Sequence, residues 1–252
     1  MTLLLQGAEA TSALAKSSKA SGSGGIGRLL WPEEQITVFE ECKLLVWANS
    51  LLTSAYDFIA DFVHKHPYPP PFEIPKFRFV AAGMAIAQRP FENNGKKPTT
   101  TWVTYLLEEV LPGVEKDFVK YLHNASATSE LSPEDNDYHL AKFLTFIQHL
   151  QYVITGGVAY VSDFQGMLII LKSSSVIMIL MLDFCHRDLF GDGNIGKVFN
   201  QFPREHQCTE HCAWFELEDA SETQKKLKEN MKGRKKQGSS NAKKKSQPAG
   251  DI

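Results

Sequence analysis

The chain has 252 residues, of which 43% are hydrophobic, so it is long enough for one large globular domain or for two small lobes that share a cleft. Its formal net charge of −2 excludes a uniformly basic protein, although Lys and Arg crowd residues 225–245. The apolar start of the chain is too short for a secretory signal, so we expect an intracellular protein, either cytoplasmic or nuclear. In that reducing environment, neighbouring Cys and His side chains favour metal binding over disulfide formation.

The first half of the chain is expected to contain a leader, a helix and a strand. Residues 1–27 are rich in Ala, Ser and Gly, which predicts a disordered leader. Apolar residues recur at helical spacing over 37–66, and the proline-rich segment 66–75 ends that helix. Residues 76–88 combine β-branched and aromatic side chains with small ones, which predicts a strand.

The second half is expected to begin with a polar loop and a helix. Residues 124–137 are polar, and apolar residues at helical spacing predict a helix over 138–152. Two β-rich runs then flank Gly156-Gly157, which indicates a β-hairpin at this glycine pair.

Two later segments, 167–184 and the residues after about 221, have unusual compositions. The apolar run 167–184 approaches the length of a membrane span, but Lys172 and three serines interrupt it, so we expect no membrane-spanning segment. The residues after about 221 are rich in Lys and end in a Ser- and Lys-rich stretch. This composition predicts a basic, disordered tail.

The segment HQCTEHC, residues 206–212, offers an imidazole and two thiols within seven residues, at His206, Cys208 and Cys212. A structural zinc ion takes four N or S ligands, so a fourth must come from elsewhere, with His211 as a spare. His149 lies ahead of the predicted hairpin and is a candidate. Its alternative role is that of a hydrogen-bonded core histidine.

Five motifs follow one another in a specific order. Together they resemble the C-terminal half of the alpha-type (atypical) protein kinases, and the upstream segments are similar to fungal members of that family. The resemblance covers about residues 30–217, and the order of its motifs is more specific than any single motif. The motifs are His149, Thr155-Gly156-Gly157, Asp163-Phe164-Gln165-Gly166, the glycine-rich loop Gly191 to Gly196, and His206-x-Cys208-x-x-x-Cys212.

The resemblance implies an α+β, two-lobed fold of the protein-kinase type. A partial small lobe would span 28–105, and a larger lobe, stabilised by zinc, would span 106–218 before the disordered tail 219–252. The implied zinc ligands are His149, His206, Cys208 and Cys212, which form a closed tetrahedral set of two imidazoles and two thiolates. The alternative is that both cysteines are buried free thiols.

The resemblance also assigns roles in phosphoryl transfer. Asp163, placed at the end of a strand, is the catalytic carboxylate, and Gln165 on the same face contacts the magnesium–phosphate assembly. Glu108, with Glu109 as the alternative, lies at the hinge position that meets the adenine of ATP, and Lys120 belongs to a basic–aromatic pair with Tyr121. Asp163 has the alternative role of capping a turn. Glu108, Glu109, Lys120 and Tyr121 have the alternative of forming a solvated surface.

The string GDGNIG, residues 191–196, has the G-x-G-x-x-G form of a dinucleotide-binding loop. That interpretation requires a βαβ unit, whereas here the metal motif follows, so we reject it. In the alpha-kinase family this loop lies by the peptide-substrate site. The implied substrate-loop residues are Gly191, Gly193, Asn194 and Gly196.

Two departures from the family pattern bear on activity. Ser173 stands where the family has a magnesium-binding Asp, and a hydroxyl is a poor substitute for a carboxylate on Mg²⁺. The phosphate-gripping Lys of the small lobe has no counterpart, since Lys16 and Lys19 are the only lysines ahead of Thr37.

Two functions are therefore weighed. The first is an alpha-type serine/threonine protein kinase that uses ATP and Mg²⁺ on a protein substrate and holds a structural Zn²⁺. The second is a catalytically inactive pseudokinase or truncated paralogue that acts as a binding module. A zinc-binding nucleic-acid module is not favoured, because no base-reading element accompanies the Lys-rich tail.

Overall fold

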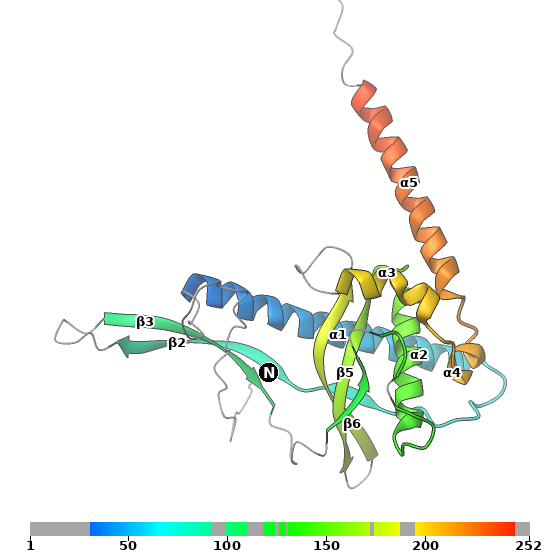
Figure 1. Cartoon of the computed structure of the whole chain (residues 1–252), viewed down its shortest axis with the longest axis horizontal. Coiled ribbons are helices and arrows are strands. Elements are labelled where there is room, and N and C mark those ends of the chain that lie inside the picture. Colours follow the sequence, from blue (N-terminus) through cyan, green and yellow to red (C-terminus); the bar gives the residue numbers. More distant parts are fainter. Residues whose placement is uncertain are drawn as a thin grey trace, which may run out of the picture. The chain divides into compact units, whose positions relative to one another are not determined.

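The computed structural model describes residues 31–91, 99–109, 118–123, 126–129, 131–171, 174–186 and 195–244. Helices and strands are both present, which confirms the predicted α+β class (Figure 1). In chain order the elements are α1 (Trp31–Lys65), β1 (Phe77–Phe79), β2 (Ala82–Phe91), β3 (Thr99–Glu108), β4 (Val119–Leu122), α2 (Tyr138–Ile154), β5 (Ala159–Leu171), β6 (Ser174–His186), α3 (Ile195–Glu205), α4 (Glu210–Trp214) and α5 (Ala220–Lys244).

The chain divides into two compact units that are each built from several segments. Unit 1 comprises Met1–Leu51, Pro75–Lys120 and Gln165–Leu182, and unit 2 comprises Leu52–Ile74, Tyr121–Phe164 and Asp183–Ile252. The two predicted lobes, 28–105 and 106–218, are each continuous in sequence, and their boundary stays a prediction.

In unit 1 the N-terminal part of α1 packs on strand β3. The helix begins at Trp31 rather than near Thr37. Glu33 and Glu34 in its first turn stabilise it, because negative charge interacts favourably with the positive end of the helix dipole. One of them, Glu34, is 2% exposed, and its carboxylate accepts the backbone N–H of Thr104 at 3.0 Å. The Trp31 and Trp102 rings lie 6.0 Å apart. These contacts cover one edge of β3, since a strand edge carries unpaired backbone groups.

The strand predicted over 76–88 is present as two strands. β1 pairs in parallel with β6, and β2 pairs antiparallel with β3 from Ala82↔Glu108 to Phe91↔Thr99. The break falls at Val80 and Ala81, where the chain leaves one sheet and enters the other. The larger sheet has the order β1-β6-β5-β4.

Residues 167–171 of the apolar run belong to strand β5 and residues 174–184 to strand β6; residues 172 and 173 lie outside the described part of the chain. Within the part of the chain that the structure describes, no helix is long and apolar enough to cross a membrane. The run is therefore explained by strand formation, for which β-branched and other apolar residues are favoured.

The predicted hairpin at Gly156-Gly157 is wrong. The first β-rich run, which begins at Tyr152, is the last turn of helix α2, and only the second forms a strand, β5. The Gly157 N–H donates to the Tyr152 carbonyl at 2.7 Å and the Gly156 N–H to that of Val153 at 2.9 Å. This pair of bonds is the Schellman motif that ends helices, and the positive φ of 64° at Gly156 is the conformation it requires.

Replacing Gly157 with Ala is expected to destabilise the protein by about 1–3 kcal/mol. Its φ of 79° is unfavourable for any side chain, and an added Cβ would lie 3.2 Å from the Tyr152 hydroxyl. The matched control is Gly233→Ala in helix α5, where no atom lies within 4 Å of the new Cβ and a gain of about 0.5–1 kcal/mol is expected. Denaturant unfolding measures both; equal stabilities of the two variants would contradict this account of the loop.

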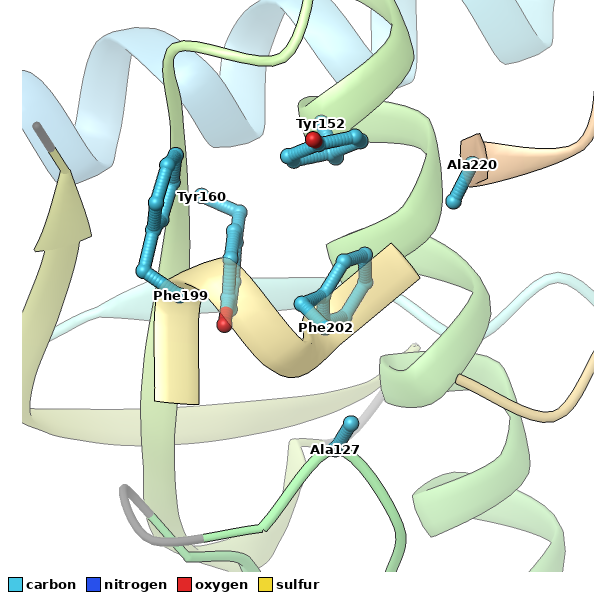
Figure 2. Packing of buried hydrophobic residues seen from close by; sticks show 6 residues of the cluster. All are labelled: Ala127, Tyr152, Tyr160, Phe199, Phe202 and Ala220. Carbon is cyan, nitrogen blue, oxygen red and sulfur yellow. The ribbon is translucent and has the colours of Figure 1, made fainter. Parts of the chain in front are cut away.

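The core of unit 2 contains an aromatic cluster that joins α2, β5 and α3. Figure 2 shows the Tyr160 ring between Phe199 and Phe202, with Tyr152 beside them. The ring centroids of Tyr160 and Phe202 are 4.3 Å apart, and those of Tyr152 and Phe202 are 5.2 Å apart. All four rings are at most 5% exposed, so this cluster fixes α3 against the helix and strand that carry the candidate site residues.

The tail differs from its prediction. Residues 220–244 form helix α5, whereas the sequence predicts disorder from 219 onward. The Asp219 carboxylate accepts the Ser221 N–H at 2.7 Å, and Glu222 lies three residues after Asp219, as in a helix-capping box. Lys225 pairs with Glu222 one turn earlier. These short-range signals outweigh the high charge that suggested disorder.

Candidate metal centre and active site

Four N and S donors meet inside unit 2. His149 comes from α2, His206 follows the end of α3, Cys208 precedes the short helix α4, and Cys212 lies within α4. Their ligand atoms all lie within 4.8 Å of one another. The Cys208 Sγ is 3.9 Å from His149 Nδ1, and the Cys212 Sγ is 3.8 Å from His206 Nε2. The sequence prediction that His149 joins the HQCTEHC segment in space is therefore confirmed.

This donor set fits a tetrahedral zinc ion. Zn–N and Zn–S bonds of about 2.0–2.3 Å at tetrahedral angles place neighbouring donors about 3.3–3.8 Å apart, close to the two N···S distances in the cluster. Two thiols and two imidazoles are also the ligand types that structural zinc prefers. His149 is fully buried and Cys212 is 2% exposed, whereas His206 is half-buried and Cys208 is exposed, so the cluster lies at the edge of the core of unit 2.

Burial sets the protonation of these four groups. Desolvation lowers the pKa of His149, and it lowers that of His206 to about 3, with the neighbouring His149 as a further cause. Desolvation also raises the pKa of Cys208 and that of Cys212, the latter to about 11. Both imidazoles are therefore neutral, as metal ligands must be, and both thiols hold protons that a metal would displace.

His211, the spare candidate in the sequence, lies outside the donor set. Its ring is packed among aromatic side chains, 4.3 Å from the centroid of Phe72 and 5.3 Å from that of Phe143. Burial lowers its pKa to about 4, and its Nδ1 lies 3.3 Å from the Thr209 hydroxyl. His211 is thus a core residue that packs α4 into unit 2.

Two buried glutamines of α2 hold strand β5, and the sequence analysis missed them. The Gln148 amide donates to the carbonyls of Val161 and Ser162 at 2.9 and 3.0 Å. The Gln151 side-chain oxygen accepts the Val161 N–H at 2.9 Å. Helix side chains thus replace a neighbouring strand on this part of β5, just before Asp163. The available signal was a pair of glutamines at i and i+3 on an otherwise apolar helix face.

Asp163 lies inside β5 rather than at its end, so that detail of the prediction is wrong. It is 4% exposed and is flanked by the buried Ser162 and Phe164. Gln165 is two residues further along the same strand and half-buried. Because side chains alternate along a strand, Asp163 and Gln165 point to the same face, as predicted.

The hinge candidates lie at the end of β3 in unit 1. Glu108 is the last residue of β3 and pairs with Ala82. Its carboxylate contributes, after burial and Glu41, to raising the pKa of the Cys42 thiol. The neighbouring Glu109 has a different role, because both of its oxygens are bonded to Arg78, at 2.7 and 2.8 Å.

The two residues of the basic–aromatic pair on β4, Lys120 and Tyr121, differ in burial. Lys120 is half-buried, whereas Tyr121 is fully buried, so the solvated-surface alternative is wrong for Tyr121. Desolvation raises the pKa of the Tyr121 hydroxyl. Tyr121 is thus a core residue of unit 2.

The sequence model of the Alpha-kinase family matches residues 9–212. The chain belongs to the alpha-kinase family. In the comparison with curated proteins nothing matches. Family membership makes the chain a protein kinase by resemblance, and kinases of this family generally use ATP and Mg²⁺. The matched region begins inside the segment that the sequence analysis treats as a leader.

Several alpha-kinase motif positions lie outside the described residues: Ser173, Gly191, Gly193 and Asn194. Gly196 is the second residue of helix α3, so it belongs to a helix rather than to a loop. A strand precedes the GDGNIG string and a helix follows it, but the described elements after α3 are the helices α4 and α5. No βαβ unit is present among them, which supports rejection of a dinucleotide-binding loop.

Glu109 is expected to make the stability of the protein depend on pH. The hydrogen bond with Arg78 holds its pKa below the usual 4.5. A carboxyl whose pKa is lowered by folding stabilises the native state above its unfolded pKa, and this contribution is lost as pH falls through the folded pKa. The free energy of unfolding of the parent should therefore exceed that of Glu109→Gln at pH 6–7, and the difference should close below about pH 4.5. Urea titrations at several pH values measure it; a difference that widens on acidification would contradict the assignment.

Proposed function

We propose that this member of the alpha-kinase family is a serine/threonine protein kinase, which transfers the γ-phosphate of ATP to a hydroxyl of a protein substrate. The observation that carries the proposal is the position of Asp163 and Gln165 on one face of β5. That strand is fixed at Val161 by Gln148 and Gln151 of α2, the helix that also carries His149 of the donor cluster. A strand whose backbone is held in this way keeps a catalytic base in a fixed place along the chain.

Each proposed residue has a distinct task. Asp163 orients the incoming hydroxyl and accepts its proton, and Gln165 contacts the phosphate side of the nucleotide. Glu108 meets the adenine and Lys120 assists in nucleotide binding. Mg²⁺ supplied with ATP neutralises phosphate charge. Gly191, Gly193, Asn194 and Gly196 form the proposed peptide-substrate segment.

Zinc is the proposed structural ion of the donor cluster. His149, His206, Cys208 and Cys212 would hold it with no position left for water, so its role is structural rather than catalytic. It would tie α2 to the segment from His206 to Cys212, which includes the first part of α4. The ion pair of Lys142 and Glu210 joins the same two parts of unit 2.

The alternative function is a pseudokinase or truncated paralogue that binds partners. Ser173 in place of a magnesium-binding carboxylate favours it, because stabilisation of the transition state in phosphoryl transfer is mainly electrostatic. In this alternative, Asp163 and Gln165 take no part in phosphoryl transfer.

The test is transfer of labelled phosphate from Mg-ATP, by zinc-loaded protein, to itself and to a basic test protein. Asp163→Ala is the control. Transfer that disappears in the control supports the kinase. A folded, zinc-bound protein that transfers nothing supports the binding module.

A further inference from the structure

The Glu109 carboxylate is held by three donor groups from two residues of unit 1, Arg78 and Ala81. The two terminal nitrogens of the Arg78 guanidinium donate to its two oxygens at 2.7 and 2.8 Å. The backbone N–H of Ala81 donates to Oε2 at 3.0 Å. This is the two-bond pairing of guanidinium and carboxylate, which fixes direction as well as distance.

The backbone at Glu109 is fixed as well. The Glu109 N–H donates to the Ala81 carbonyl at 2.8 Å, one step beyond the last pair of the β2–β3 ladder, Ala82↔Glu108. Arg78 also donates to the Phe79 carbonyl at 3.2 Å, so its side chain is held on both sides. The set links the end of β1, the break before β2 and the end of β3.

The residue positioned by this arrangement is Glu108, which forms the last pair of the β2–β3 ladder and directly precedes Glu109. A residue that binds adenine must keep its backbone and side chain in one conformation. If the binding-competent conformation is only partly populated, the apparent affinity for the nucleotide falls by that fraction. Arg78 and Glu109 lie 31 residues apart, so their pairing is a tertiary feature rather than a helical or turn contact.

We propose that the Arg78–Glu109 ion pair is a positioning device that holds Glu108 in the conformation that receives the adenine of ATP. The inference rests on the proposed function, and it adds two residues that set nucleotide affinity without touching the reacting phosphate. Both side chains are partly exposed, at 45% and 32%. An exposed pair contributes modestly, so we expect changes of about threefold to fivefold in affinity rather than loss of binding.

The experiment is a double-mutant cycle on the full, zinc-loaded chain. The variants are Arg78→Gln, Glu109→Gln and the two together, and the matched control is Lys225→Gln, which removes an exposed ion pair with Glu222 on helix α5. Gln at 109 keeps the shape of the side chain and can still accept the Ala81 N–H. The Kd of a fluorescent ATP analogue with Mg²⁺ is measured for each protein, together with the thermal unfolding midpoint and, where transfer occurs, KM for ATP and kcat.

The expected result is a Kd and a KM for ATP about threefold to fivefold higher in each single variant, with kcat unchanged. The double variant should be no weaker than either single one, because both singles break the same pair. Lys225→Gln should bind as the parent does. Arg78→Lys, which keeps the charge but loses the planar fork, should recover part of the affinity.

Three results would overturn the proposal. These are single variants that match the parent in Kd, effects that multiply in the double variant, and a loss of affinity in Lys225→Gln equal to that in the single variants. A parent that binds ATP but transfers no phosphate contradicts kinase activity alone, and the cycle still decides the role of the pair. A folded parent that binds no ATP contradicts both.

Discussion

Cys212→Ser is expected to abolish zinc binding and to unfold the part of unit 2 around α4. Cys212 is 2% exposed and its Sγ lies 3.8 Å from His206 Nε2. Serine keeps nearly the same volume, so the substitution removes a ligand rather than packing. Structural zinc contributes about 10–16 kcal/mol to small zinc domains, and loss of one thiolate is expected to remove several kcal/mol of that. Metal analysis and circular dichroism of the purified variant measure the two effects.

Cys42→Ser is the matched control for the zinc prediction. Cys42 is also a free cysteine, but it lies on α1 in unit 1, outside the donor cluster. The Cys42→Ser protein should bind one zinc ion per chain and should have the same circular dichroism spectrum as the parent. A Cys212→Ser protein that keeps its zinc and its fold would show that the four donors do not form a metal site.

Asp163→Asn is expected to lower kcat by a factor of about 10²–10⁴, with little change in KM for ATP. The amide keeps the shape and burial of the carboxylate but cannot accept the proton of the substrate hydroxyl. Because Asn matches Asp in size and the strand is held by the glutamines of α2, the substitution should leave the fold intact although Asp163 is only 4% exposed. Steady-state kinetics with Mg-ATP and a basic test protein measure both parameters.

The control for Asp163 is Asp61→Asn. Asp61 is 79% exposed on α1, where it forms an ion pair of 3.9 Å with Lys65, so kcat should not change. An Asp163→Asn enzyme with the kcat of the parent would place the catalytic base elsewhere.

The metal cluster illustrates what the sequence predicts well. Cys208 and Cys212 are four residues apart, and the turn into α4 brings both to one side, so the sequence alone limits their geometry. The order of the motifs then identifies His149 as the fourth donor, although it lies far away in the chain. The types of the four side chains indicate metal binding, and the family pattern indicates that His149 joins the other three.

The stretch from Tyr152 to Gly157 illustrates where sequence patterns fail. Aromatic and β-branched residues suggest a strand after Tyr152, but Val153 and Ile154 extend the helix that is predicted over 138–152. The buried face of this helix is set by tertiary contacts, including that of Tyr152 with the Phe202 ring. The glycine pair serves equally well in a hairpin turn and in a helix C-terminus. Only packing distinguishes the two.

The sequence also does not predict which of several chemically similar residues makes a given long-range contact. Glu108 and Glu109 are adjacent and chemically identical, and only the structure shows that Arg78 takes the carboxylate of Glu109. The two glutamines of α2 likewise acquire their role from the backbone of β5, which periodicity does not reveal. In both cases one residue type fits several partners, and the fold chooses among them.

Mass spectrometry of a basic test protein, after incubation with Mg-ATP and the zinc-loaded chain, tests the central claim most directly. The account predicts phosphate on Ser or Thr side chains of the test protein when the parent is used, and none when Asp163→Asn is used. Absence of phosphate with a folded, zinc-bound parent, or equal phosphate with both proteins, would contradict it.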